Sequence, residues 1–217
     1  YLLGFMGWLA AIVSSDEKMF SYDGLLVVGR LLSAMVDSIT VLLVYLLARI
    51  KLNKKWALTA SLIYSLAVFP IQSGRFFTVD SYLTMWIVGY LWMVAKWRVE
   101  KENKFLLIAA VFWGLALATK FSALIAGGVV GILAIVDVVT FIRKSDGKKL
   151  LYLSKDGILF GLIAIVVLTI TQPYMWIDWN NFLNSMKEQT RMRIDPWTFP
   201  YTRQYVGTLP YIYHLEQ

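Results

Sequence analysis

Long apolar stretches separated by short polar segments make up most of this 217-residue chain, and they constrain its fold more than any other feature. Hydrophobic residues account for 59% of the sequence and charged residues for 16%, against roughly 45–50% and about 25% in soluble domains. A soluble chain of this length cannot bury so much apolar surface, because its interior is too small. We therefore expect lipid to be the solvent for much of the chain.

Six of these stretches are candidates for membrane-spanning helices, which need about 20 apolar residues to cross a core of about 30 Å. An earlier stretch, residues 2–13, is too short to span and is expected to form a surface helix. The pattern predicts an all-α, polytopic membrane helix bundle over residues 1–172, incomplete in this chain, followed by an external aromatic- and proline-rich loop over residues 173–217. The predicted spans are residues 24–50, 57–72, 79–95, 105–119, 122–142 and 157–172.

Basic residues gather in three alternate loops, residues 49–56, 96–104 and 143–156, which hold most of the 21 lysines and arginines. Because lysine and arginine are enriched in cytoplasmic loops, we place these loops in the cytoplasm and the intervening ends outside. The prediction is a multi-pass protein of the cell membrane with an external active face. The net charge of +7 then reflects membrane orientation, and we expect no nucleic-acid partner.

Metal and redox chemistry find little support in the composition. The chain has no cysteine and a single histidine, His214, which excludes disulfides and thiolate sites and argues against a histidine-based zinc site. We assign no cofactor and no metal ligand from the sequence, and we leave open whether a divalent metal takes part.

Lys120 lies in a break between two apolar stretches on the predicted external side. Residues 105–119 extend only about 22 Å as a helix at 1.5 Å per residue, so the break should lie below the membrane surface. An ammonium at that depth needs a water-filled cavity or a counter-ion. We therefore expect an external recess in which Lys120 binds phosphate; the alternative is a lysine that extends to the lipid headgroups.

Arg75 and Asp80 lie five residues apart where two predicted spans meet on the external side. The planar guanidinium of arginine suits phosphate, so Arg75 is a candidate anion ligand, and Asp80 is expected to orient it or a substrate. The alternative is an interfacial salt bridge that fixes a turn. Arg30 is a weaker phosphate candidate near the external end of its span, whereas Asp37 is interpreted as structural.

The predicted external loop mixes arginines, amides and aromatic rings over residues 191–211. Such residues suit a sugar phosphate, so Arg203 is a third candidate phosphate ligand. Tyr201, Gln204 and Tyr205 are candidate substrate-binding residues. The alternative is an ordered loop that clamps helices.

Asp137, near the cytoplasmic end of its span, is interpreted as structural and within reach of the basic residues around position 143.

Four segments together resemble the lipid-carrier-dependent glycosyltransferases of the C-type fold, to which protein O-mannosyltransferases and lipid A aminoarabinose transferases are related. The resemblance covers nearly the whole chain, and the order of the segments carries it more than any one motif. Gly74 departs from the pattern, where a polar residue or histidine is expected. The segments are VGRLLSAMVDSITVLLVYLLAR (residues 28–49), RFFTVDSYLT (75–84), GLALATKFSAL (114–124) and PYTRQYVGTLPYIY (200–213).

The resemblance implies transfer of a sugar from a polyprenyl-phosphate donor to the hydroxyl of a protein, lipid or glycan acceptor at the external face. It also implies an acidic general base in a first external loop. That loop is expected to precede this chain, so Asp16 and Glu17 are not assigned the role and the chain alone is expected to be inactive. In this scheme Arg75, Lys120 and Arg203 neutralise the phosphate that leaves.

Two other classes of function remain as alternatives. A multi-pass transporter or lipid flippase would also carry charges at broken helices, but the sequence shows no repeated pair of interrupted spans. A non-catalytic membrane scaffold would not need Arg75, Lys120 and the external loop to converge.

Overall fold

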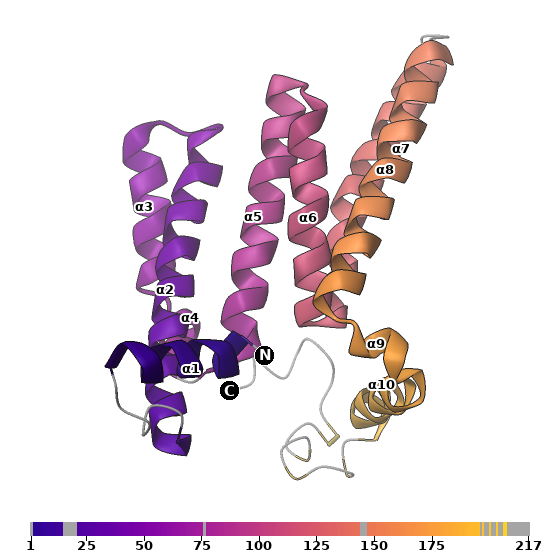
Figure 1. The fold of residues 1–217 in the computed structure, drawn as a ribbon. Coiled ribbons are helices and arrows are strands. Elements are labelled where there is room, and N and C mark those ends of the chain that lie inside the picture. The colour runs from indigo at the N-terminus through magenta and orange to yellow at the C-terminus, as the bar shows by residue number, and fades with distance from the viewer. Residues whose placement is uncertain are drawn as a thin grey trace. The chain divides into compact units, whose positions relative to one another are not determined.

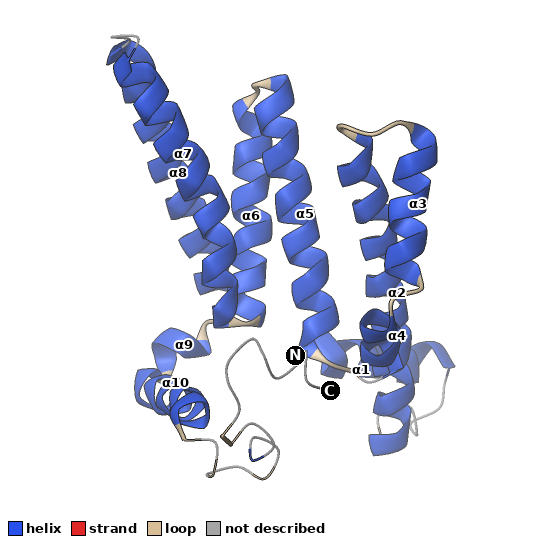
Figure 2. Ribbon diagram, turned by 180° about the vertical axis from the view of Figure 1, so that it is seen from behind, coloured by secondary structure: helices blue, strands red, loops and turns tan. Residues whose placement is uncertain are grey.

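The computed structural model describes residues 2–14, 21–75, 77–143, 147–195, 197, 200, 203 and 206–207. Every regular element within these residues is a helix (Figure 2), which confirms the all-α prediction. The elements are α1 (Leu2–Ser14), α2 (Tyr22–Arg49), α3 (Lys54–Ser65), α4 (Val68–Arg75), α5 (Val79–Glu100), α6 (Asn103–Thr119), the 3₁₀ turn η2 (Phe121–Ala123), α7 (Leu124–Arg143), α8 (Gly147–Thr171), α9 (Tyr174–Ile177) and α10 (Trp179–Ile194).

The chain divides into two compact units, Tyr1–Thr171 and Gln172–Gln217. In the first unit, α5 packs between α2 and α6, and α6 packs between α5 and α8 (Figure 1). Helices α3 and α4 pack on α2. Helix α1 runs across the direction of the long helices (Figure 1), the orientation a helix in the membrane plane would take, although its place at a membrane surface stays a prediction.

The interior of the first unit is an apolar cluster between α5, α6, α7 and α8. Tyr90 and Ala109 are fully buried there, and a Trp113–Phe160 ring stack joins α6 to α8 with centroids 5.2 Å apart. Glycines permit the close approach of these helices: a Cβ at Gly114 would lie 2.7 Å from the Ala164 carbonyl oxygen of α8. Many large apolar side chains elsewhere on these helices are exposed, as expected for surfaces that face lipid.

In the described part of the chain, two helices are long and apolar enough to cross a membrane: Asp23–Arg49, and Phe121–Thr140, which includes η2. The predicted span over residues 57–72 is instead a bent pair, since α3 and α4 meet at 51° and form either a broken span or a re-entrant loop. Pro70 explains the break, because proline has no N–H to donate to the carbonyl of residue 66 and its ring disfavours a continuing helix. The count of six spans stays a prediction.

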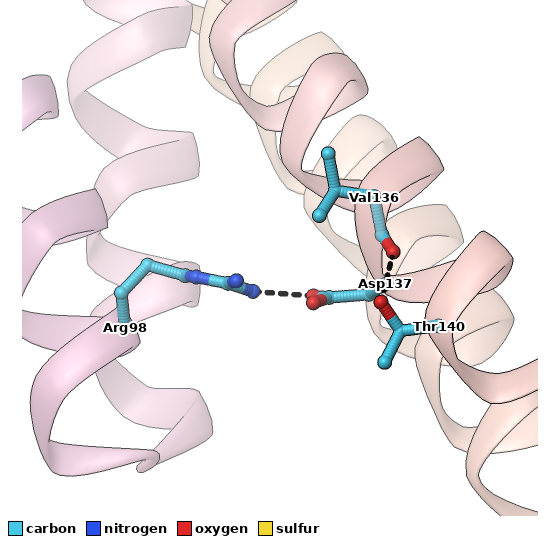
Figure 3. A network of polar contacts seen from close by, with 4 residues as sticks. All are labelled: Arg98, Val136, Asp137 and Thr140. Atoms are coloured by element: carbon cyan, nitrogen blue, oxygen red, sulfur yellow. Dashed lines mark hydrogen bonds and ion pairs between the residues drawn. The ribbon is translucent and has the colours of Figure 1, made fainter. Parts of the chain in front are cut away.

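The two ends of the helix bundle differ in their connections. The α2–α3 and α5–α6 loops lie at one end, and the α4–α5 and α6–η2 turns lie at the other (Figure 1). At the first end Arg98 of α5 donates a hydrogen bond to Asp137 of α7, and Thr140 donates to the Val136 carbonyl (Figure 3). Asp137 therefore joins α7 to α5 through Arg98, as its structural interpretation suggests; Lys144 lies outside the described residues, so the reach of the basic residues around position 143 to Asp137 stays a prediction.

Membrane orientation can be tested with single cysteines, because the chain has none of its own. We expect a membrane-impermeant maleimide to label Ser122→Cys from outside the cell and to label Lys54→Cys only after the membrane is opened. The reason is the basic character of the α2–α3 loop. Labelling of Lys54→Cys in intact cells, with Ser122→Cys protected, would reverse the orientation of the bundle.

Candidate functional site

Lys120 and Asp80 form an ion pair at the end of the bundle opposite to Arg98. The Lys120 ammonium donates to the Asp80 carboxylate with an Nζ–Oδ1 distance of 2.9 Å. The side chains are 46% and 37% exposed, so the ammonium keeps donors for a ligand. Lys120 is the C-cap of α6, and Asp80 lies in the first turn of α5. Each charge therefore also complements the dipole of the helix end that carries it.

The extended backbone at Lys120 breaks α6 from η2, with φ −156° and ψ 123°. Two contacts fix this break: the indole N–H of Trp113 donates to the Ala123 carbonyl at 3.0 Å, and the Lys120 N–H donates to Ala116 at 2.9 Å. The Trp113 ring also lies against the backbone of Gly127 in α7. The local sequence thus holds a lysine in non-helical backbone where two apolar helices meet.

Substitution of Gly127 tests this support. A Cβ at Gly127 would lie 2.2 Å from Cζ2 of Trp113, so Gly127→Ala should displace the indole and lower the unfolding free energy by about 1–3 kcal/mol. The matched control is Gly128→Ala, where a Cβ meets nothing within 4 Å and alanine should stabilise the helix slightly. Thermal melting of both variants checks the difference, and equal melting temperatures would contradict it.

Arg75 ends α4 beside the turn that leads to Asp80, and its side chain is exposed. No ion pair joins Arg75 to Asp80 within the described residues, and the Asp80 carboxylate binds Lys120 instead; a role of Asp80 towards a substrate stays a prediction. Within the described part of the chain Arg75 makes no ion pair, so its guanidinium is available to an anion. The side chain of Asp80 also does not cap α5, where Thr78 is the N-cap.

Arg30 lies in the same region of the first unit, since its neighbour Gly29 contacts the α4–α5 turn. A Cβ at Gly29 would lie 2.9 Å from the Phe77 Cβ, so α2 approaches this turn closely. The Arg30 side chain is exposed. Arg30, Arg75 and Lys120 therefore belong to elements that meet at one end of the bundle, with Asp80 as the carboxylate bound to one of them.

The Asp37 carboxylate lies against α4, as the structural interpretation of this residue requires. A Cβ at Gly74 would lie 2.7 Å from Asp37 Oδ2. This contact explains the departure from the family pattern at position 74, because a side chain there would collide with the carboxylate. Asp37 thus packs on the residue that precedes Arg75 and limits where the end of α4 can lie.

The second unit carries the remaining candidates. Arg203 is described there, and its Nε donates to the Trp197 carbonyl at 3.4 Å. Tyr201, Gln204 and Tyr205 lie outside the described residues. The role of all four residues in the site stays a prediction, as does the external recess.

Sequence reasoning placed Lys120 and Asp80 on the same side of the membrane but did not pair them. A signal was present, because both residues lie at helix ends on that side and carry opposite charges.

Within the described residues, no three histidine or acidic side chains gather as a metal site would require, and metal dependence stays untested.

Comparison with known protein families gives one match that covers most of the chain. The profile of a family described as dolichyl-phosphate-mannose-protein mannosyltransferase matches residues 6–176. The match includes the elements that carry Arg30, Arg75, Asp80 and Lys120. Neither the comparison with curated proteins nor the comparison with solved structures gives a match.

Proposed function

Because this chain belongs to the dolichyl-phosphate-mannose-protein mannosyltransferase family, we propose that it transfers a mannosyl group from a polyprenyl-phosphate donor to a protein hydroxyl. The family establishes a mannosyltransferase-type glycosyltransferase of the membrane. The lipid-linked donor, the protein acceptor, the cell membrane and the external face are parts of this proposal. Its main support is the Lys120–Asp80 pair at the helix break, with Arg75 and Arg30 on adjoining elements.

The proposed step breaks the bond between the anomeric carbon and the phosphate oxygen and forms a bond to the acceptor oxygen. The acceptor proton passes to a carboxylate general base, and polyprenyl phosphate leaves. A sugar phosphodiester carries one negative charge, whereas the phosphate monoester that departs carries about −1.5 to −2 at neutral pH. Negative charge on the phosphate therefore grows during the reaction.

Cations beside the phosphate stabilise this transition state more than the bound donor, which is the condition for catalysis. Lys120 suits the task because Asp80 and the helix break hold its ammonium in place while almost half of the side chain remains exposed. Arg75 would add a two-point contact to phosphate oxygens. In this proposal the positive charges of Lys120 and Arg75 together stabilise the leaving phosphate.

A donor comparison tests the proposal. Intact protein in liposomes receives an acceptor peptide with serine and threonine, together with radiolabelled mannose linked either to polyprenyl phosphate or to a nucleotide. We expect label on the peptide hydroxyls from the lipid-linked donor alone. Transfer from the nucleotide donor alone, or movement of the lipid across the bilayer without transfer, would contradict the proposal and favour a different enzyme or a flippase.

A further inference from the structure

Over residues 179–186, helix α10 in the second unit has one apolar face and one polar face; further along, Thr190 and Arg193 lie on the side of the apolar face. Trp179, Phe182, Leu183 and Met186 recur at spacings of three and four residues and therefore share one side of the helix. Glu188 follows Trp179 by nine residues, or two and a half turns, and so lies on the opposite side. Trp179 is 45% exposed, and Phe182, Leu183 and Met186 are half-buried, so its own unit covers the apolar side only in part.

Positive charge borders this apolar face. Lys187 and Arg191 are one turn apart and exposed, and at 100° per residue they lie about 80° and 120° around the helix from Trp179. An apolar face with basic residues on its flank and an acidic residue opposite is the pattern of helices that lie in a membrane interface.

Aromatic rings continue the apolar face from α9 into α10. Trp176 and Trp179 stack with centroids 6.1 Å apart and planes at 8°, and Trp179 stacks on Phe182 at 5.6 Å and 29°. The three rings thus form one continuous aromatic surface that runs from α9 into α10. Tryptophan is enriched where membrane and water meet, and Trp176 is 51% exposed.

Chain connectivity places this face close to a membrane boundary. The 25-residue α8 ends at Thr171, and only Gln172 and Pro173 separate it from α9. The first residues of the second unit therefore begin where the predicted final span ends. Helix α10 starts at Trp179, one short helix later.

We propose that α9 and α10 form an interfacial membrane anchor, in which the stack of Trp176, Trp179 and Phe182 inserts among lipid headgroups. Lys187 and Arg191 contact anionic headgroups, and Glu188 faces water. The anchor holds the start of the second unit at the bilayer surface, where a lipid-linked substrate would enter. It does not depend on the proposed transferase reaction.

The absence of cysteine from the chain permits a direct test. Single spin labels are placed at Leu183→Cys and Met186→Cys on the apolar face, and at Glu188→Cys as the matched control. The intact protein is reconstituted in liposomes that contain phosphatidylglycerol. Power saturation then compares label accessibility to oxygen, which enters lipid, with accessibility to a water-soluble nickel chelate.

We expect the labels at positions 183 and 186 to be several-fold more accessible to oxygen than to nickel, and the label at position 188 to show the reverse. In the double variant Lys187→Gln/Arg191→Gln, the label at position 183 should lie closer to the surface of the bilayer in these liposomes. Two results would overturn the proposal: equal nickel accessibility on both faces, which would place α10 in water, or protection of the apolar face from both reagents, which would mean that protein covers it.

Discussion

Replacing Lys120 with alanine is expected to lower the rate of single-turnover sugar transfer by about 10- to 150-fold without unfolding the protein. This range corresponds to the loss of one hydrogen bond to a charged group, about 1.5–3 kcal/mol, at about 1.4 kcal/mol per factor of ten. The loss should appear in donor use, because in the proposed reaction the ammonium stabilises the negative charge that develops on the phosphate. Lys120→Arg keeps the charge and should recover part of the rate.

The Arg98–Asp137 pair provides the matched control for this substitution. Lys120→Ala and Arg98→Ala each remove the cation from an ion pair between two helices and leave an aspartate unpaired, but they do so at opposite ends of the bundle. Both variants should melt at lower temperature than the wild type. Only Lys120→Ala should lose donor affinity, and an equal loss in Arg98→Ala would mean that Lys120 acts through stability alone.

Replacing Arg75 with alanine is expected to reduce transfer on the order of 100-fold, because a two-point contact to phosphate is lost. Arg75→Lys keeps the charge but not the planar guanidinium. Its transfer rate should therefore still be about 10-fold below that of the wild type. Asp80→Asn should have a smaller effect than Arg75→Ala, since Asp80 positions Lys120 and leaves Arg75 free. Single-turnover transfer from the lipid-linked donor measures all three.

Arg49 is the control for the general effect of positive charge. It is exposed at the end of α2, where its guanidinium donates to the Leu52 carbonyl at 2.9 Å, at the opposite end of the bundle from Arg75. Arg49→Ala changes the net charge as Arg75→Ala does but should leave transfer unchanged. Wild-type rates in both Arg75 variants would show that this arginine only fixes the turn.

Features that depend on local pattern could be predicted from the sequence. The helical class follows from the apolar stretches, and the break at Lys120 follows from a charged residue between two of them. The bend between α3 and α4 was also encoded locally, in Pro70, but the apolar composition of residues 57–72 favoured a continuous helix. Apolar composition reports burial in lipid and does not report the continuity of backbone hydrogen bonds.

The partner of Asp80 could not be predicted, because it depends on how helices pack. Five residues separate Asp80 from Arg75, whereas 40 separate it from Lys120, and sequence proximity favoured the wrong pair. The correct pair forms because α5 packs on α6 so that the start of one helix lies beside the end of the other. Gly74 similarly looked like a departure from the family pattern until the position of Asp37 explained it.

Binding of polyprenyl phosphate tests most directly whether this end of the bundle receives the phosphate of the donor. The measurement is the dissociation constant of the intact, reconstituted protein at pH 7.5 and at pH 5, below the second phosphate pKa of about 6. Wild type should bind the lipid more weakly at pH 5, where the phosphate has one charge less. The variant Arg75→Ala/Lys120→Ala should bind at least 10-fold more weakly at pH 7.5 and show a smaller dependence on pH. Unchanged affinity and pH dependence in that variant would contradict the account.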